Sequence, residues 1–115
     1  LLAGAQLASE RAEDDVKTIL YDLLARETGG LALNFRQLMM KHMRNRIRLS
    51  RDPQRAANFV VLRQAETPAV LIELGFISHA EEEKQMRSTE WQRQVATAIT
   101  AAIEDYFSKR KAIFR

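Results

Sequence analysis

Apolar residues in the first part of the chain recur at steps of three and four, the spacing that places them on one face of an α-helix. Those of residues 16–24 follow the acidic run of residues 13–15, whose charges suit a helix N-terminus. The pair Gly29-Gly30 is typical of a helix stop, and a second helical pattern then runs from Leu31 to about Ser50. The pattern predicts two helices joined as a hairpin.

The pattern changes beyond Asp52-Pro53. Residues 58–63 and 69–74 are short, nearly continuous apolar runs bounded by polar residues and breakers, which favours two strands covered on both faces. The sequence Ser78-His79-Ala80-Glu81 then fits a capping box with Ser78 as N-cap, and it predicts a short acidic helix directly after the second strand. A final amphipathic helix is predicted over residues 88–108.

The expected order is therefore helix-helix-strand-strand-helix-helix. Two buried strands are too few for a stable sheet, because they need neighbours on their edges and layers on both faces. The predicted fold class is α/β, with this chain as the C-terminal part of a helix-flanked mixed sheet. We expect one domain over residues 1–115, with a helical connection and hairpin at 1–57 and a strand-strand-helix core at 58–115.

Composition narrows the possible chemistry. The chain has 115 residues and no cysteine, which excludes disulfides, thiolate metal sites and a cysteine nucleophile. No apolar run approaches the roughly 18 residues that a membrane span needs, so no transmembrane segment is predicted. The formal net charge of +3 permits an anionic partner without requiring one.

Glu73 is the main candidate for chemistry, since it is a carboxylate inside an otherwise apolar run. An unpaired, ionised carboxylate is costly to bury. Alternation places it on the opposite face from Ile72 and Leu74, at the C-terminal end of the predicted strand, where open α/β sheets bind their ligands. The residues alone leave two interpretations open: a functional carboxylate, or a glutamate that pairs with a buried arginine or emerges at the end of the strand.

Several segments together resemble a known family. They are Phe59-Val-Val-Leu-Arg63, Thr67-Pro-Ala-Val-Leu-Ile-Glu-Leu-Gly-Phe-Ile-Ser78, Glu81-Glu-Glu83 and the helix of residues 91–107. Their order and spacing resemble the zinc-dependent N-acetylmuramoyl-L-alanine amidases of the type 3 amidase family, which are bacterial cell-wall hydrolases. More weakly, residues 14–28 resemble the segment after the regulatory helix in the periplasmic cell-division branch of that family.

The resemblance implies cleavage of the amide between N-acetylmuramic acid and the L-alanine of the stem peptide by zinc-activated water, with Glu73 as general base and acid. The family holds its zinc with two histidines and a glutamate from the N-terminal half of the domain. None of those motifs occurs in this sequence, so the zinc ligands are expected outside this chain, and the segment alone is expected to be inactive. The alternative is a metal-free module that binds peptidoglycan or a partner protein.

The resemblance also implies a setting. Peptidoglycan is the expected substrate, and the periplasm is the expected location. In the periplasmic branch, a helix upstream of the Asp14 region blocks the active site, and an activator protein relieves this autoinhibition. We therefore expect an activator among the partners.

The remaining candidates are interpreted as structural. His42 lies in an apolar helical stripe and His79 at the start of a helix, and their spacing does not support a zinc site, so neither is predicted to bind metal. The basic stretch from Lys41 to Arg55 lacks interleaved aromatic residues, and we interpret it as a solvated helix face rather than a nucleic-acid site. Contact with an anionic wall polymer remains an alternative.

Overall fold

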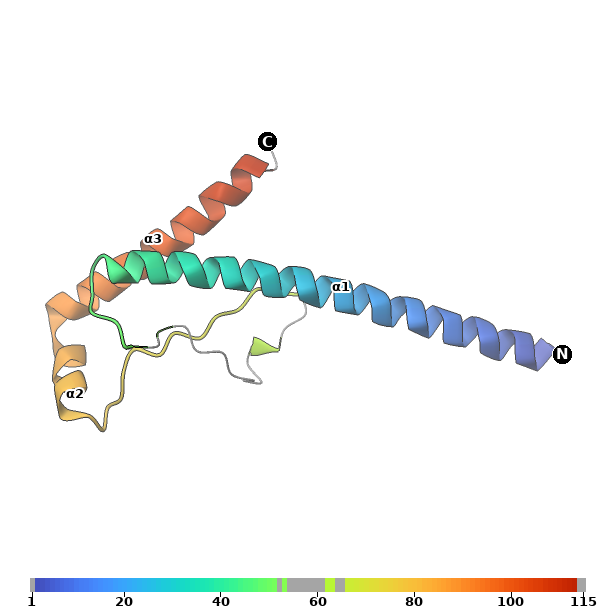
Figure 1. Ribbon diagram of the computed structural model, residues 1–115, viewed down its shortest axis with the longest axis horizontal. Coiled ribbons are helices and arrows are strands. Elements are labelled where there is room, and N and C mark those ends of the chain that lie inside the picture. The colour runs from blue at the N-terminus through green and yellow to red at the C-terminus, as the bar shows by residue number, and fades with distance from the viewer. Residues whose placement is uncertain (1, 52, 54–61, 64–65, 114–115) are drawn as a thin grey trace.

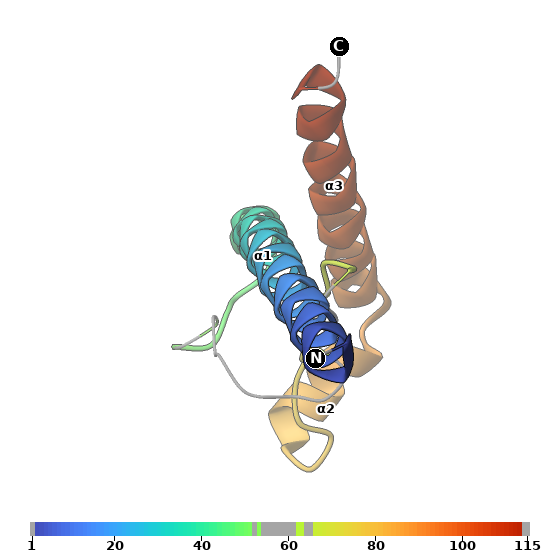
Figure 2. The ribbon, with the colours of Figure 1, turned by 90° about the vertical axis from the view of Figure 1, so that its right-hand side faces the viewer.

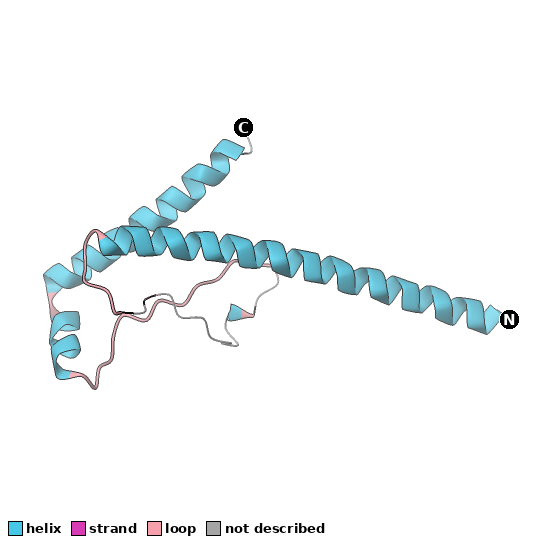
Figure 3. Cartoon of the chain, in the orientation of Figure 1, coloured by secondary structure: helices cyan, strands magenta, loops and turns pink. Residues whose placement is uncertain are grey.

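Three helices make up most of the computed structural model, which describes residues 2–51, 53, 62–63 and 66–113. They are α1 (Leu2–Arg44), α2 (Ala80–Arg87) and α3 (Thr89–Ile113), and a long connection joins α1 to α2 (Figures 1 and 3). No strand occurs within these described ranges. The predicted α/β class with a mixed sheet is therefore wrong, and the described part of the chain is all-α.

Helix α1 runs without a break through Gly29 and Gly30, so the predicted helical hairpin is also wrong. Neither glycine has a positive φ, the conformation in which glycine usually ends a helix. A glycine inside a helix costs only about 1 kcal/mol relative to alanine. Helix propagation is cooperative, and good helix-forming sequence on both sides outweighs that cost.

The second predicted strand is instead irregular. Residues 68–76 have no regular secondary structure, although their apolar pattern favours a strand. A strand exists only when a neighbour accepts and donates its backbone hydrogen bonds, and no other segment of the described chain supplies such a ladder. Of the first predicted strand, residues 58–63, positions 58–61 lie outside the described residues, and residues 62–63 do not form a strand.

The two predicted C-terminal helices are confirmed, with a shift of one residue at the first cap. The N-cap of α2 is His79 rather than Ser78, and its Nδ1 accepts a hydrogen bond from the Glu82 backbone N–H at 3.4 Å. Ser88 then serves both helices. Its N–H donates to the carbonyl of Gln85 at 3.0 Å to end α2, and its Oγ accepts from the Trp91 N–H at 3.3 Å to begin α3.

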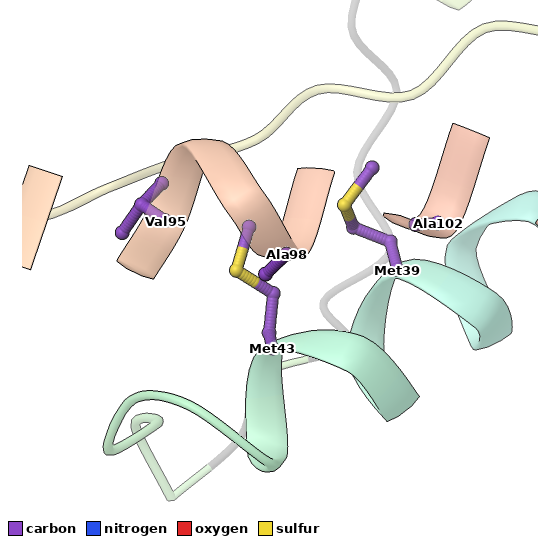
Figure 4. Packing of buried hydrophobic residues seen from close by; sticks show 5 residues of the cluster. All are labelled: Met39, Met43, Val95, Ala98 and Ala102. Carbon is purple, nitrogen blue, oxygen red and sulfur yellow. The ribbon is translucent and has the colours of Figure 1, made fainter. Parts of the chain in front are cut away.

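The core lies where α3 crosses the C-terminal part of α1 (Figure 2). Met39 and Met43 of α1 point toward α3, where they meet Val95, Ala98 and Ala102 (Figure 4). Both alanines are 0% exposed, and their small side chains let the methionines approach the backbone of α3. Partly buried apolar residues surround this cluster, namely Phe35, Ile47, Leu49, Trp91 and Ile99.

Aromatic contacts extend the same interface toward the C-terminus of α3. The rings of Phe35 and Tyr106 pack with their centroids 5.1 Å apart at a tilt of 56°. Arg110 lies over the Tyr106 ring and also donates a hydrogen bond to its hydroxyl at 2.9 Å. The Phe35–Tyr106 contact lengthens the seam between α1 and α3 by about one turn of α3 beyond Ala102, whereas the contacts of Arg110 lie within α3.

The N-terminal half of α1 projects away from the rest of the molecule (Figure 1). The radius of gyration is 20.8 Å, whereas about 13 Å is expected for a compact chain of this length. No helix among the described residues combines the length and the apolarity needed to cross a membrane. The large apolar side chains left exposed on this part of α1 are Leu7, Val16, Ile19, Leu20, Tyr21, Leu23 and Leu24.

The burial pattern predicts which half of α1 contributes to stability. Met43 is 4% exposed and Leu20 is 60% exposed. Met43→Ala is expected to lower the free energy of unfolding of the chain by about 2–5 kcal/mol, because it leaves a cavity against α3. Leu20→Ala, the matched control, is expected to change it by less than about 0.5 kcal/mol. Urea unfolding followed by circular dichroism measures both, and equal losses would contradict the assigned core.

Candidate functional site

Glu73 lies in the irregular segment of residues 68–76, and its side chain is exposed. Leu71, Ile72 and Leu74 beside it are also exposed. Within the described ranges, no lysine, arginine or histidine nitrogen lies within 4.0 Å of the Glu73 carboxylate. Pairing with a buried arginine, one alternative that the sequence left open, is thus not seen in the described part of the chain. The carboxylate is accessible to water and to a ligand.

Two features determine the direction of the backbone just after Glu73: a turn at Gly75 and a hydrogen bond from Phe76 to Glu82. Gly75 has a φ of +153°, a conformation that residues with a side chain rarely adopt. The next backbone N–H, that of Phe76, donates a hydrogen bond to Oε2 of Glu82 at 2.7 Å. A Cβ at position 75 would lie 3.3 Å from that same oxygen. The loop after Glu73 is thus attached to the first turn of α2.

The two histidines take structural positions. His42 Nε2 lies 3.0 Å from Oδ2 of Asp105, and this partly buried pair links α1 to α3. Lys109 also contacts Asp105, at 3.4 Å. The hydrogen bond with His42, followed by the positive charge of Lys109, lowers the pKa of Asp105. His79 caps α2, as described above.

The described residues do not fit a zinc ion. A protein zinc site usually needs at least three nitrogen, oxygen or sulfur ligands from side chains. No group of three histidine, aspartate or glutamate side chains is placed to hold a metal within the described ranges. His42 and His79 both have other partners. The expectation that the ligands lie outside this chain stays a prediction.

The basic stretch lies on the surface at the end of α1. Lys41, Arg44, Arg46 and Arg48 are exposed, and Arg55 lies outside the described residues. A cleft of about 670 Å³ opens beside this stretch, and one hydrogen bond, from Arg46 to Oε1 of Gln94 at 3.1 Å, crosses it. It is lined by both charge signs, which does not single out an anionic ligand. The lining residues are His42, Asn45, Arg46, Glu90 and Gln94.

Sequence reasoning did not find Glu82 as a partner of the loop or Asp105 as a partner of His42. The acidic run of residues 81–83 signals a helix N-terminus, and it does not show which carboxylate turns back toward Phe76. Asp105 is 63 residues from His42, so only the packing of α3 on α1 brings them together. No motif in the sequence marks either contact.

Comparison with known proteins identifies the class. The family model described as N-acetylmuramoyl-L-alanine amidase matches residues 20–105, which include Glu73, Glu82 and most of α3. The chain therefore belongs to the N-acetylmuramoyl-L-alanine amidase family, and the resemblance noted in the sequence is confirmed.

Individual relatives agree with the family. The chain is 27% identical over its full length to the N-acetylmuramoyl-L-alanine amidase AmiC of Escherichia coli O6:H1, covering 27% of that protein. It is 31% identical to AmiA of Escherichia coli K12, with 89% of this chain and 36% of that protein aligned. A putative amidase of Buchnera aphidicola (subsp. Schizaphis graminum) is 32% identical, with 82% of this chain and 40% of that protein aligned. The chain thus spans less than half the length of these relatives. No solved structure matches it significantly.

The His42–Asp105 pair predicts a pH dependence of stability. Because the pKa of Asp105 is lowered from 3.8 in the folded chain, its contribution is present above that value and is lost as the pH falls through the lower, folded pKa. We expect Asp105→Asn to be less stable than the wild type at pH 5–6, with the difference shrinking below about pH 4.

Urea unfolding of the wild type and the variant at a series of pH values measures this difference. Glu104→Gln is the control, because Glu104 is the exposed neighbour of Asp105 on α3 and its side chain has no partner within the described chain. A gap between wild type and Asp105→Asn that stays constant from pH 6 to pH 3 would contradict a charged role for Asp105.

Proposed function

We propose that this chain is part of a peptidoglycan hydrolase that cleaves the amide between N-acetylmuramic acid and the L-alanine of the stem peptide. Two observations support the proposal. The chain belongs to the N-acetylmuramoyl-L-alanine amidase family over residues 20–105. Within that range, Glu73 presents an accessible carboxylate without a partner in the described part of the chain. The accessible Glu73 is the observation on which the proposal depends most.

Glu73 is proposed as the general base and acid of the reaction. Amide hydrolysis needs a group that takes a proton from the attacking water and then gives a proton to the leaving amine nitrogen. One carboxylate can do both in turn, since it is regenerated when the second transfer is complete. Its exposure in the present structure leaves room for water and for the substrate amide beside it.

Zinc is part of this proposal, with its ligands on residues outside this chain. When bound, zinc would supply Lewis-acid chemistry at the scissile carbonyl. No group of three possible ligands is found among the described residues, and the proposal therefore places the ligands elsewhere in the protein. The second candidate function is a metal-free module that binds peptidoglycan or a partner protein.

The remaining proposals concern the setting. Peptidoglycan is the proposed substrate and the periplasm the proposed location, in keeping with the relatives named as N-acetylmuramoyl-L-alanine amidases. An activator protein that relieves autoinhibition is proposed from the resemblance of residues 14–28 to the periplasmic branch. The exposed apolar side chains on the N-terminal half of α1 and at residues 71–77 support contact between this chain and further protein surface.

A Glu73→Gln variant of the full-length protein tests the assigned role. We expect kcat for release of stem peptide from peptidoglycan to fall by about 10²- to 10⁴-fold, because glutamine cannot accept and return the proton. The circular dichroism spectrum is expected to stay unchanged, because Glu73 has no partner in the described fold to lose. The zinc content of the same full-length sample is also measured, because the proposed enzyme is expected to hold zinc and the metal-free module is not.

Glu66→Gln is the matched control, because Glu66 is also exposed and lies seven residues before Glu73 in the same connection. It is expected to keep the wild-type kcat. Full activity of Glu73→Gln would exclude Glu73 as the base. Wild-type protein that binds peptidoglycan without cleaving it would favour the metal-free module.

A further inference from the structure

We propose that Glu82 is a positioning residue for Glu73, acting through the loop of residues 74–77. This inference rests on the proposed function, since it assigns Glu82 a part in the same reaction. Glu82 lies nine residues beyond Glu73 and does not need to touch the substrate. Its carboxylate holds the chain that leaves Glu73, and so limits where the Glu73 side chain can lie.

The contact itself is strong for a surface interaction. The Phe76 N–H donates to Oε2 of Glu82 at 2.7 Å, and a hydrogen bond to an ionised acceptor is stronger than one between neutral groups. Gly75 allows this geometry. Its φ of +153° turns the chain, and its missing side chain lets Oε2 of Glu82 and the thioether of Met86 come close.

The turn that follows closes on the same helix. The His79 N–H donates to the Phe76 carbonyl at 3.1 Å, and the His79 ring accepts from the Glu82 N–H at 3.4 Å. Phe76 is therefore held through both its N–H and its carbonyl, by the side chain of Glu82 and the backbone of His79. Residues 76–82 form one small hydrogen-bonded unit at the N-terminus of α2.

Helix α2 is in turn attached to α3. Nε2 of Gln92 donates to the carbonyl of Met86 at 2.7 Å, and Ser88 caps the adjoining ends of both helices. Since α3 packs on α1 through the methionine cluster, a continuous set of contacts runs from the core to Phe76. The bond from Glu82 is the final link before Glu73.

The neighbouring acids show that this position is specific. Glu83 pairs with Arg87 along α2, and Glu81 is exposed with no side-chain partner in the described part of the chain. Of the acids at 81–83, Glu82 alone turns toward the loop. Glu81 therefore offers a matched control with the same charge, the same helix and the adjacent position.

The first experiment measures the contact without reference to activity. Hydrogen exchange of the Phe76 backbone amide is followed in full-length protein carrying Glu82→Ala, Glu82→Gln or Glu81→Ala. We expect Glu82→Ala to speed exchange at Phe76 by at least about fivefold, because a net hydrogen bond of roughly 1 kcal/mol is lost. Glu81→Ala is expected to match the wild type, and Glu82→Gln, which keeps an acceptor oxygen, to lie closer to the wild type than Glu82→Ala.

The second experiment measures the reaction in the same variants. Glu82→Ala is expected to lower kcat by about 10- to 100-fold with KM within about twofold of the wild type, since a base displaced by about 1 Å loses rate while the binding contacts remain. Glu82→Gln is expected to restore most of kcat. Gly75→Ala, which strains the same turn, is expected to reproduce the loss and serves as a second variant should Glu82→Ala fold poorly.

The outcomes separate the two hypotheses. If Glu73→Gln is inactive and Glu82→Ala keeps the wild-type kcat despite faster exchange at Phe76, the positioning role is wrong and the proposed function stands. Unchanged exchange at Phe76 in Glu82→Ala also overturns the inference. If Glu73→Gln keeps full activity, the proposed role of Glu73 as the base fails, and the positioning role of Glu82 fails with it.

Discussion

The contact between two methionines of α1 and two alanines of α3 is the interaction on which the described structure depends. Met39 and Met43 fill the space that Ala98 and Ala102 leave open, and this is the only cluster of buried apolar residues that joins distant parts of the described chain. Helix α2 is held in place by its contacts with α3, and the loop after Glu73 is held in place by its contact with α2. Loosening this one interface would therefore separate α1 from α3 and from the elements attached to α3, namely α2 and the loop after Glu73.

The same interface is small for a chain of this length, and that explains the extended shape. Large apolar residues remain exposed along α1 and in the segment around Glu73, including Phe76 and Ile77. Single exposed apolar residues are ordinary, but long stripes of them mark surfaces that contact other protein. The chain spans 27% of the length of AmiC and 36% of that of AmiA.

Local signals in the sequence predicted local features, and features that need a distant partner were missed. The amphipathic pattern of residues 88–108 correctly predicted a helix there, and its apolar face includes the buried Val95, Ala98 and Ala102. The glycine pair at 29–30 led to the wrong prediction of a helix end, because the low helix propensity of two glycines is outweighed by the cooperative propagation of a long helix. The apolar run at 69–74 led to the wrong prediction of a strand, because a strand forms only beside a second strand, which the local sequence does not reveal. Glu73 stood out as an isolated charge, whereas the contact between Glu82 and Phe76 depends on a turn at Gly75 that no motif in the sequence marks.

The contacts that connect the core to the loop after Glu73 are of three different kinds. Apolar packing joins α1 to α3, caps and one glutamine side chain join α3 to α2, and a single carboxylate joins α2 to the loop. The last step rests on one hydrogen bond between exposed groups, so local opening is expected to be easiest there. If Glu73 is the base that we propose, its carboxylate keeps its direction only while the last contact, between α2 and the loop, holds. That contact is the hydrogen bond from Phe76 to Glu82, and the position proposed for Glu73 as the base depends on it.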